Sequence, residues 1–131
     1  MEAGSSVNVK PVPRGFNSTL NAILDALNGS GLSVVEQIDL SGRIVRHPAA
    51  PGRNCVMLLV DSPLLLFEAV ALERSAAVFI PLHVVVAGDQ RSTHIHWAHP
   101  ADSMGLRAPR AGRGAVDTLY ARVTEVLSNA V

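Results

Sequence analysis

Hydrophobic positions along the chain follow two different periods, which together predict strands and helices in alternation. Apolar residues that alternate with polar ones predict strands, and apolar residues that recur every three or four positions predict helices. Asn17 or Ser18 can cap the first helix, because either side chain accepts hydrogen bonds from the free amides of a first turn. The pattern predicts strands at 5–12, 32–38, 55–60, 77–87 and 92–98, helices at 18–27, 63–74 and 116–127, and irregular connections at 39–54 and 99–114.

This order of elements predicts an α+β fold. We expect a two-layer sandwich in which about three helices cover one face of a mostly antiparallel or mixed sheet of about five strands. The strand at 55–60 is apolar on both sides, with Met57 and Leu59 facing away from Leu58. Helices on one side would leave the second face uncovered, and an uncovered face is normally polar. We therefore expect the second face to meet another subunit, to enclose a ligand, or to do both.

Composition adds to this expectation and narrows the range of partners. The chain has 131 residues, which suits a single domain over 1–131, and it is 48% hydrophobic and only 17% charged. In a small domain, an excess of apolar residues usually goes into an oligomer interface or a ligand pocket. The net charge is zero, which gives no reason to expect nucleic acid or a membrane as a partner.

The cysteine content and the N-terminus indicate a compartment. Cys55 is the only cysteine, so no internal disulfide can form, and a reducing environment fits. The first residues, MEAGSSVNVK, lack the pattern of a signal peptide. No apolar run reaches the length of about 18 residues that a membrane helix needs. We expect a cytoplasmic protein that uses no cofactor.

Several short stretches follow one another in a distinctive order. A helix with a glycine-rich end precedes VVEQID, VDSP, FIPLHVVV and HIHWAHP. From about residue 16 to 104, this order resembles the bacterial family catalogued as domain of unknown function 302. The resemblance implies a two-layer sandwich that commonly pairs as a homodimer, and it implies no particular biochemical role.

The departures from that family's pattern fall on polar positions. Leu40 follows Asp39 where the family has a histidine, and Asp61-Ser62-Pro63 stands in place of Gly-Asn-Pro. His99 replaces an aspartate, and His83 replaces a residue that is often arginine. The resemblance therefore implies the fold without carrying over a polar site.

The histidines offer the clearest candidate chemistry. Three of the five lie in STHIHWAHP at 92–100. A loop of two or four residues centred on Asp89-Gln90 would bring His83, on the preceding strand, directly opposite His96. His83, His94 and His96, here called the histidine cluster, would then share one face with Cβ separations of about 5–7 Å. A loop with an odd number of residues would turn His83 away.

Three interpretations of the histidine cluster compete. Three neutral imidazoles on one face can hold a divalent ion, although no carboxylate lies nearby in the sequence. Without a metal, imidazoles in an apolar pocket can move a proton or recognise a polar group. In the third interpretation, they are interface or surface histidines that form local hydrogen bonds. Trp97 and Ile95 would face the opposite side of the sheet.

Charged residues supply further candidates. Glu36 shares the parity of Val34 and Ile38, and a carboxylate on an apolar face is costly unless it is paired. It is either a functional acid or a residue near the sheet edge that reaches solvent. Arg110 and Arg113 stand among glycines before the last helix, where they suit either an anion site or a solvated loop.

Together these patterns predict a homodimer that binds a small, mostly hydrophobic molecule in an apolar pocket on the uncovered face. If the protein is an enzyme, we expect cofactor-independent proton transfer of the cyclase, isomerase or lyase type. The alternative is a non-catalytic sensor or carrier, either for a ligand or for a metal that the histidine cluster holds. The predicted catalytic residues are His83, His94, His96 and Glu36, and the predicted ligand contacts are His99, Met57, Leu59, Val85, Arg110 and Arg113.

Overall fold

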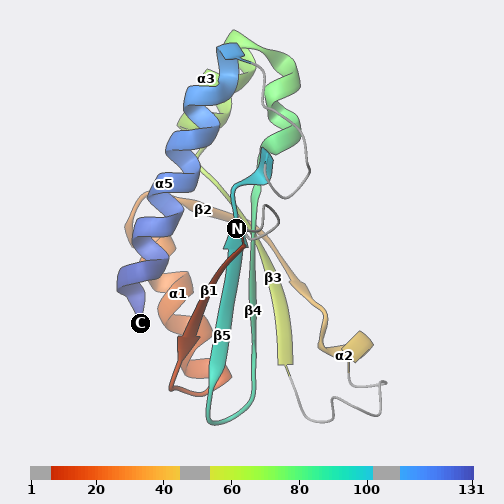
Figure 1. Ribbon diagram of the computed structural model, residues 1–131, viewed down its shortest axis with the longest axis vertical. Helices are drawn as coiled ribbons and strands as arrows, with labels where there is room; N and C mark the ends of the chain where they lie inside the picture. The colour runs from red at the N-terminus through yellow and green to blue at the C-terminus, as the bar shows by residue number, and fades with distance from the viewer. Residues whose placement is uncertain (1–6, 45–53, 102–109) are drawn as a thin grey trace, which may run out of the picture.

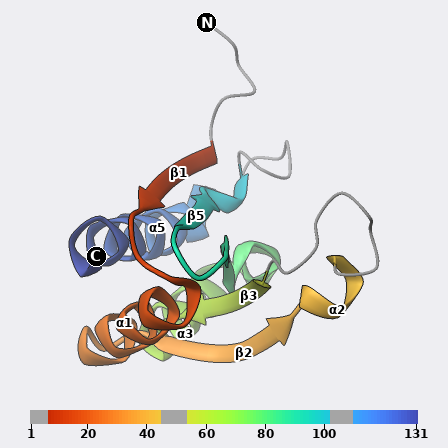
Figure 2. The ribbon, with the colours of Figure 1, turned by 90° about the horizontal axis from the view of Figure 1, so that it is seen from below.

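Five strands pair into one antiparallel sheet in the order β1-β5-β4-β3-β2, and three helices lie on one of its faces (Figure 2). The structure is a computed structural model that describes residues 7–44, 54–101 and 110–131. The strands are β1 (Val7–Val12), β2 (Ser33–Asp39), β3 (Asn54–Asp61), β4 (Leu82–Gly88) and β5 (Thr93–Ala98). The helices are α1 (Phe16–Gly29), α2 (Ser41–Ile44), α3 (Pro63–Leu72) and α5 (Arg113–Ala130), with 3₁₀ turns η1 (Arg74–Phe79) and η2 (Arg110–Gly112). The predicted two-layer α+β fold is confirmed.

The hydrophobic core lies between the sheet and helices α1, α3 and α5. Leu58, Val84 and Ile95 are fully buried on the helix side of three neighbouring strands. They join one apolar cluster with Ile23 of α1 and Leu119 of α5. Burying side chains of this size contributes roughly 1.5–3 kcal/mol each. Helix α5 runs past both α1 and α3, so it holds the two ends of the helix layer together (Figure 1).

Strand β1 is tied to α5 by polar side chains on its helix side. Asn8 Nδ2 donates to the hydroxyl of Tyr120 at 2.6 Å. Lys10 Nζ donates to the carbonyls of Leu127 and Ser128 at 3.1 and 2.7 Å. These carbonyls belong to the last turn of α5, where a cation complements the helix dipole. The outer strand is therefore attached on this side by hydrogen bonds.

Several predicted boundaries were wrong. Helix α1 begins at Phe16 after Gly15 and has no side-chain cap, so neither Asn17 nor Ser18 caps it. The strand expected from residue 77 begins only at Leu82, because residues 74–79 form η1 and Pro81 has no amide hydrogen for a ladder. The closing helix begins at Arg113, inside the segment expected to be a loop. The connection at 39–54 contains helix α2, while its residues 45–53 lie outside the described part of the chain.

Helix α3 was expected to be largely buried, and this too was wrong. It begins as the sequence indicates, with Ser62 Oγ accepting a hydrogen bond from the amide of Leu65 and with Pro63 in the first turn. Only one side of the helix, however, meets its neighbours. Leu64 and Phe67 are 72% and 71% exposed. Helix α3 is apolar on all sides, but no other described element covers the side of it that faces away from the sheet, so that side stays exposed.

A bulge in β2 changes which of its residues share a face. Val34 pairs with Val60, but Glu36 pairs with Leu59, so one extra residue interrupts the register. The extra residue reverses the parity of the rest of the strand. Glu36 and Ile38 therefore lie on the side that the helices leave uncovered, and the expectation that Glu36 shares a face with Val34 was wrong.

The hairpin between β4 and β5 has the even-numbered loop that the sequence analysis required. Gly88 pairs with Thr93, which leaves a four-residue loop from Asp89 to Ser92. Asp89 Oδ1 accepts from the amides of Arg91 and Ser92 at 2.8 and 3.0 Å. Any side chain at Gly88 would overlap the loop, since a Cβ atom there would lie 2.3 Å from the carbonyl oxygen of Ser92.

The predicted pairing was wrong by two residues. His96 lies opposite Val85 and His94 lies opposite Ala87, so His83 is not directly across from His96. A shift of two keeps every side chain on its predicted face. His83, His94 and His96 therefore do share one face, although the compact triangle that we expected is drawn out along the strands.

Candidate functional site

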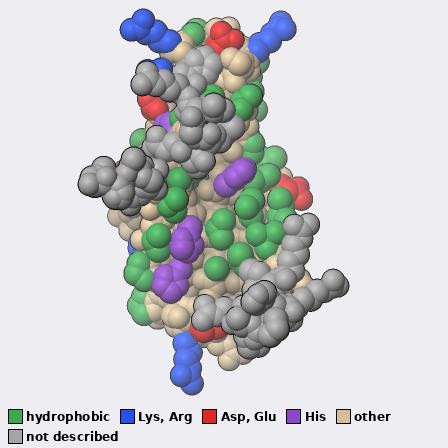
Figure 3. All heavy atoms as spheres, turned by 45° about the vertical axis from the view of Figure 1, so that its right-hand side comes forward, with side chains coloured by type: hydrophobic (Ala, Val, Ile, Leu, Met, Phe, Trp, Pro, Cys, Tyr) green, Lys and Arg blue, Asp and Glu red, His purple; other side chains and the backbone are tan. Residues whose placement is uncertain are grey.

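The uncovered face of the sheet combines histidines with apolar side chains. Strands β4 and β5 place the histidine cluster on it, and the register adds Met57 and Leu59 from β3. Figure 3 shows histidine side chains beside an area of hydrophobic ones on one side of the molecule. Val7 and Val9 of β1 are 54% and 53% exposed and belong to the same face. Within the described residues, this face is more apolar than a solvent-facing sheet surface normally is.

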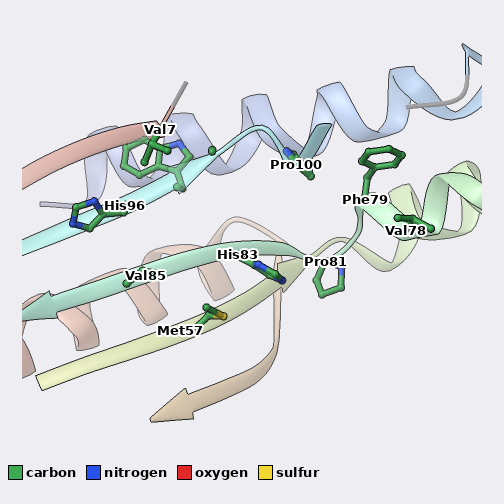
Figure 4. A pocket seen from close by; sticks show the side chains of 11 residues that line it. Val7, Met57, Val78, Phe79, Pro81, His83, Val85, His96 and Pro100 are labelled. Atoms are coloured by element: carbon green, nitrogen blue, oxygen red, sulfur yellow. The ribbon is translucent and has the colours of Figure 1, made fainter. Parts of the chain in front are cut away.

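A cavity opens where two neighbouring strands part. The ladder between β4 and β5 ends at Val84 and Trp97. Beyond that pair, β4 continues along β3 and β5 continues along β1. A cavity of about 270 Å³ lies at this divergence (Figure 4). Its lining comes from both sides of the split and from η1: Val7, Met57, Val78, Phe79, Pro81, His83, Val85, His96, Trp97, Ala98 and Pro100.

The cavity brings together four of the predicted site residues. His83 and His96 line it, together with Met57 and Val85. Figure 4 shows His83 and His96 projecting from neighbouring strands. His83 is exposed at the rim and His96 is half-buried. Neither forms a hydrogen bond or an ion pair within the part of the chain that the structure describes, so both imidazoles can bind an incoming polar group.

His94 and Leu59 lie on the same face but outside the cavity lining. The ring of His94 is 6.4 Å from that of His96, with the two planes tilted by 32°. Among the described residues, no group of three or more His, Cys, Asp or Glu side chains could hold a metal ion. The structure therefore does not assemble the histidine cluster as a three-ligand site, which such an ion would need.

His99 is turned away from the cavity and onto α5. Its Nε2 lies 2.7 Å from Oδ1 of Asp117, and its Nδ1 accepts from the amide of Ala101 at 3.1 Å. The ring also lies 5.1 Å from that of Tyr120. Both nitrogens are thus used within the protein, and the structure does not bring His99 to the ligand site where we had predicted it.

The remaining predicted residues lie elsewhere. Glu36 is exposed on β2, on the uncovered face but outside the lining. Arg110 and Arg113 are exposed at η2 and at the start of α5, and neither lines the cavity. The cavity lining consequently holds no Asp, Glu, Lys or Arg from the described part of the chain.

The buried titratable groups Cys55 and Asp61 do not line the cavity, and Cys55 is not activated for covalent chemistry. Burial raises the pKa of the Cys55 thiol, and the nearby Asp39 carboxylate raises it further. A raised pKa keeps the thiol protonated and poorly nucleophilic. Burial also raises the pKa of Asp61, whereas hydrogen bonds from Ser41 lower that of Asp39. The cavity is therefore suited to noncovalent binding, through its apolar surface and its two imidazoles.

Sequence reasoning missed most of the apolar lining. Trp97 was correctly expected to face the helices, where its Nε1 donates to Thr124 Oγ1 at 3.0 Å, yet it also borders the cavity. Pro81 and Pro100 offered the available signal, because each stands at the end of a strand and cannot extend a ladder. The other missed residues are Val7, Val78, Phe79 and Ala98.

A family model described as Domain of unknown function DUF302 matches residues 8–130. The chain belongs to the DUF302 family. The resemblance seen in the sequence is thereby confirmed, and it extends beyond residues 16–104 at both ends. A comparison with curated proteins gave no match.

A solved DUF302 structure has the same fold. It is the crystal structure of uncharacterized conserved protein DUF302 from Bacillus stearothermophilus, to which this chain is 18% identical, with a TM-score of 0.80. The match covers 97% of this chain and 99% of that one. Within the described residues, no helix of this DUF302 chain has both the length and the apolar character needed to cross a membrane.

Proposed function

We propose that this DUF302 protein binds a small, mostly apolar molecule in the cavity between the diverging ends of β4 and β5. The observation that carries the proposal is the lining itself. Apolar side chains form most of it, and the imidazoles of His83 and His96 form no hydrogen bond or ion pair with other described residues. Concave, mainly apolar sites with a few polar groups are typical of small-molecule binding. The volume of about 270 Å³ suits a ligand with one or two rings.

Two further parts of the predicted function remain proposals. We propose that a second copy of the chain covers the rest of the uncovered face, because Val9 and Ile38 are left exposed on it. Light scattering at micromolar concentration tests this, and a mass near the 13.8 kDa of one chain contradicts it. Catalysis also stays a prediction: an imidazole at the cavity could transfer a proton, and no Asp, Glu, Lys or Arg among the described residues lines the cavity beside His83 and His96.

Methyl NMR tests ligand binding directly. Indole is a small, neutral and apolar probe, and its titration should shift the methyl signals of Met57 and Val85. The methyl signals of Ile23, buried on the other side of the sheet, provide the control and should stay in place. The variant Ala98→Phe should abolish the shifts by filling the cavity. Binding is refuted if indole at millimolar concentration leaves the Met57 and Val85 signals unchanged.

A further inference from the structure

The polar groups in the cavity limit the kind of ligand that it can hold. Trp97 donates its indole hydrogen to Thr124, so the ring nitrogens of His83 and His96 are the side-chain polar atoms left for a ligand. Without an acidic side chain in the described lining, a cationic ligand would lose its hydration without gaining a counter-charge. Without arginine or lysine there, a phosphate dianion would also be poorly neutralised.

The two imidazoles are placed to act on one group. His96 pairs with Val85, and His83 lies two residues further along the same strand and face. In a regular ladder such diagonal neighbours are about 7–8 Å apart, within reach of long side chains, and His83 lies one residue past the last pair, where the strands begin to part. A carboxylate has two oxygens, and each can accept a hydrogen bond from a separate donor. One carboxylate can therefore bridge both rings, with each ring donating one N–H group to one oxygen.

We infer that the ligand of this cavity is a hydrophobic monocarboxylate, held by its two oxygens between His83 and His96. This inference rests on the proposed binding function and specifies its ligand class. The apolar body of the ligand lies against the hydrophobic lining, which includes the rings of Phe79 and Pro81. The carboxylate lies toward the rim, where His83 is exposed and part of its hydration can be kept.

A matched set of three probes tests the inference. 3-Phenylpropanoate, 3-phenylpropanamide and 3-phenylpropylammonium share one body and differ in charge. Titration followed at the Met57 methyl signal should give the carboxylate an affinity about tenfold above that of the amide, because charge-assisted hydrogen bonds are roughly twice as strong as neutral ones. The ammonium compound should bind most weakly of the three.

Variants assign the effect to the two rings. His83→Gln and His96→Gln should each bring the carboxylate affinity close to that of the amide, while the amide affinity changes by less than about threefold. His94→Gln is the matched control, because His94 shares the face but does not line the cavity, and it should change neither affinity. Retained amide binding also shows that each variant is folded.

The outcomes separate the inference from the function on which it rests. An amide that binds as tightly as the carboxylate overturns the inference and leaves the apolar cavity intact. A loss in His94→Gln equal to that in His96→Gln also overturns it, since the effect would then come from the charge of the whole face. If neither indole nor any of the three probes moves the Met57 signal, the proposed function falls with it.

Discussion

The Nε2 atom of His99 lies 2.7 Å from Oδ1 of Asp117 and joins the end of β5 to α5. The other ring nitrogen accepts from the amide of Ala101, so one imidazole fixes the backbone on both sides of Pro100. Pro100 belongs to the cavity lining. His99 therefore positions a wall of the site without reaching into it.

This arrangement predicts unequal effects for the two partners. His99→Ala removes both hydrogen bonds and the ring contact, and it should lower the free energy of unfolding by about 1–2 kcal/mol. Asp117→Asn should cost at most about 0.5 kcal/mol, because Asp117 is exposed and ion pairs at the surface contribute little. Urea unfolding monitored by circular dichroism measures both. Equal losses in the two variants would mean that neither the Ala101 hydrogen bond nor the ring contact with Tyr120 adds to stability.

Gly112, just before α5, lies against η1 with no room for a side chain. A Cβ atom there would be 2.4 Å from Cβ of Ala76, which is fully buried. Gly112→Ala should cost about 1–3 kcal/mol through this overlap. Adding Ala76→Gly should recover most of that loss, and thermal unfolding of the single and double variants measures the coupling.

Gly114 provides the matched control for this prediction. Nothing lies within 4 Å of a Cβ atom built at that position. Gly114→Ala should therefore raise stability, by up to about 1 kcal/mol, because alanine favours the helix over glycine. If Gly112→Ala is also neutral or stabilising, the close packing of η1 against the start of α5 is not present in solution.

Asp61 should make the protein less stable as the pH rises. Burial raises its pKa in the folded state above the ordinary value of 3.8, so the folded protein binds its proton more tightly than the unfolded chain does. Stability is therefore highest below that ordinary value and falls as the pH rises through the raised pKa. Asp61→Asn has no charge to bury, so its advantage over the natural protein should appear above pH 4 and then become constant.

Asp39 should make stability change with pH in the opposite direction. Hydrogen bonds from Ser41 lower the pKa of Asp39 in the folded state. Its contribution to the free energy of unfolding is therefore present at pH values above its ordinary pKa and is lost as the pH falls through the lowered pKa. Urea unfolding from pH 3 to 8 should show Asp61→Asn gaining on the natural protein with rising pH and Asp39→Asn losing ground. A constant gap between Asp61→Asn and the natural protein over this range would show that burial of Asp61 has no effect.

The sequence predicted the layers and the uncovered apolar face because both depend on the period of the apolar positions. Prediction from the sequence failed where one inserted residue changes the period of the apolar positions. The bulge at Val35 moved Glu36 to the other face, and alternation alone cannot reveal an inserted residue. The hairpin register was wrong by two because the four-residue loop, which Gly88 and Thr93 close, lies one residue later in the chain than expected. Even so, the parity held, and His83 and His96 were found on one face.

The cavity itself could not be predicted from periodicity. It depends on where the ladder between β4 and β5 stops. Val78 and Phe79 enter its lining from η1, although both were expected to lie in a strand. His99 shows the reverse case. A histidine beside a strand end looked available for a ligand, but the distant Asp117 on α5 takes one of its nitrogens. Contacts between residues so far apart in the chain leave no local pattern.

The separation of β4 from β5 also bears on how this pocket could diversify. Its space comes from the course of two backbones, while most of the buried side chains that stabilise the fold lie on the opposite side of the sheet. Residues such as Val85, Ala98 and Val78 can therefore be exchanged for larger, smaller or more polar ones with little loss of stability. Under the proposed function, changes at these positions would alter which ligand the cavity fits, with no rearrangement of the chain.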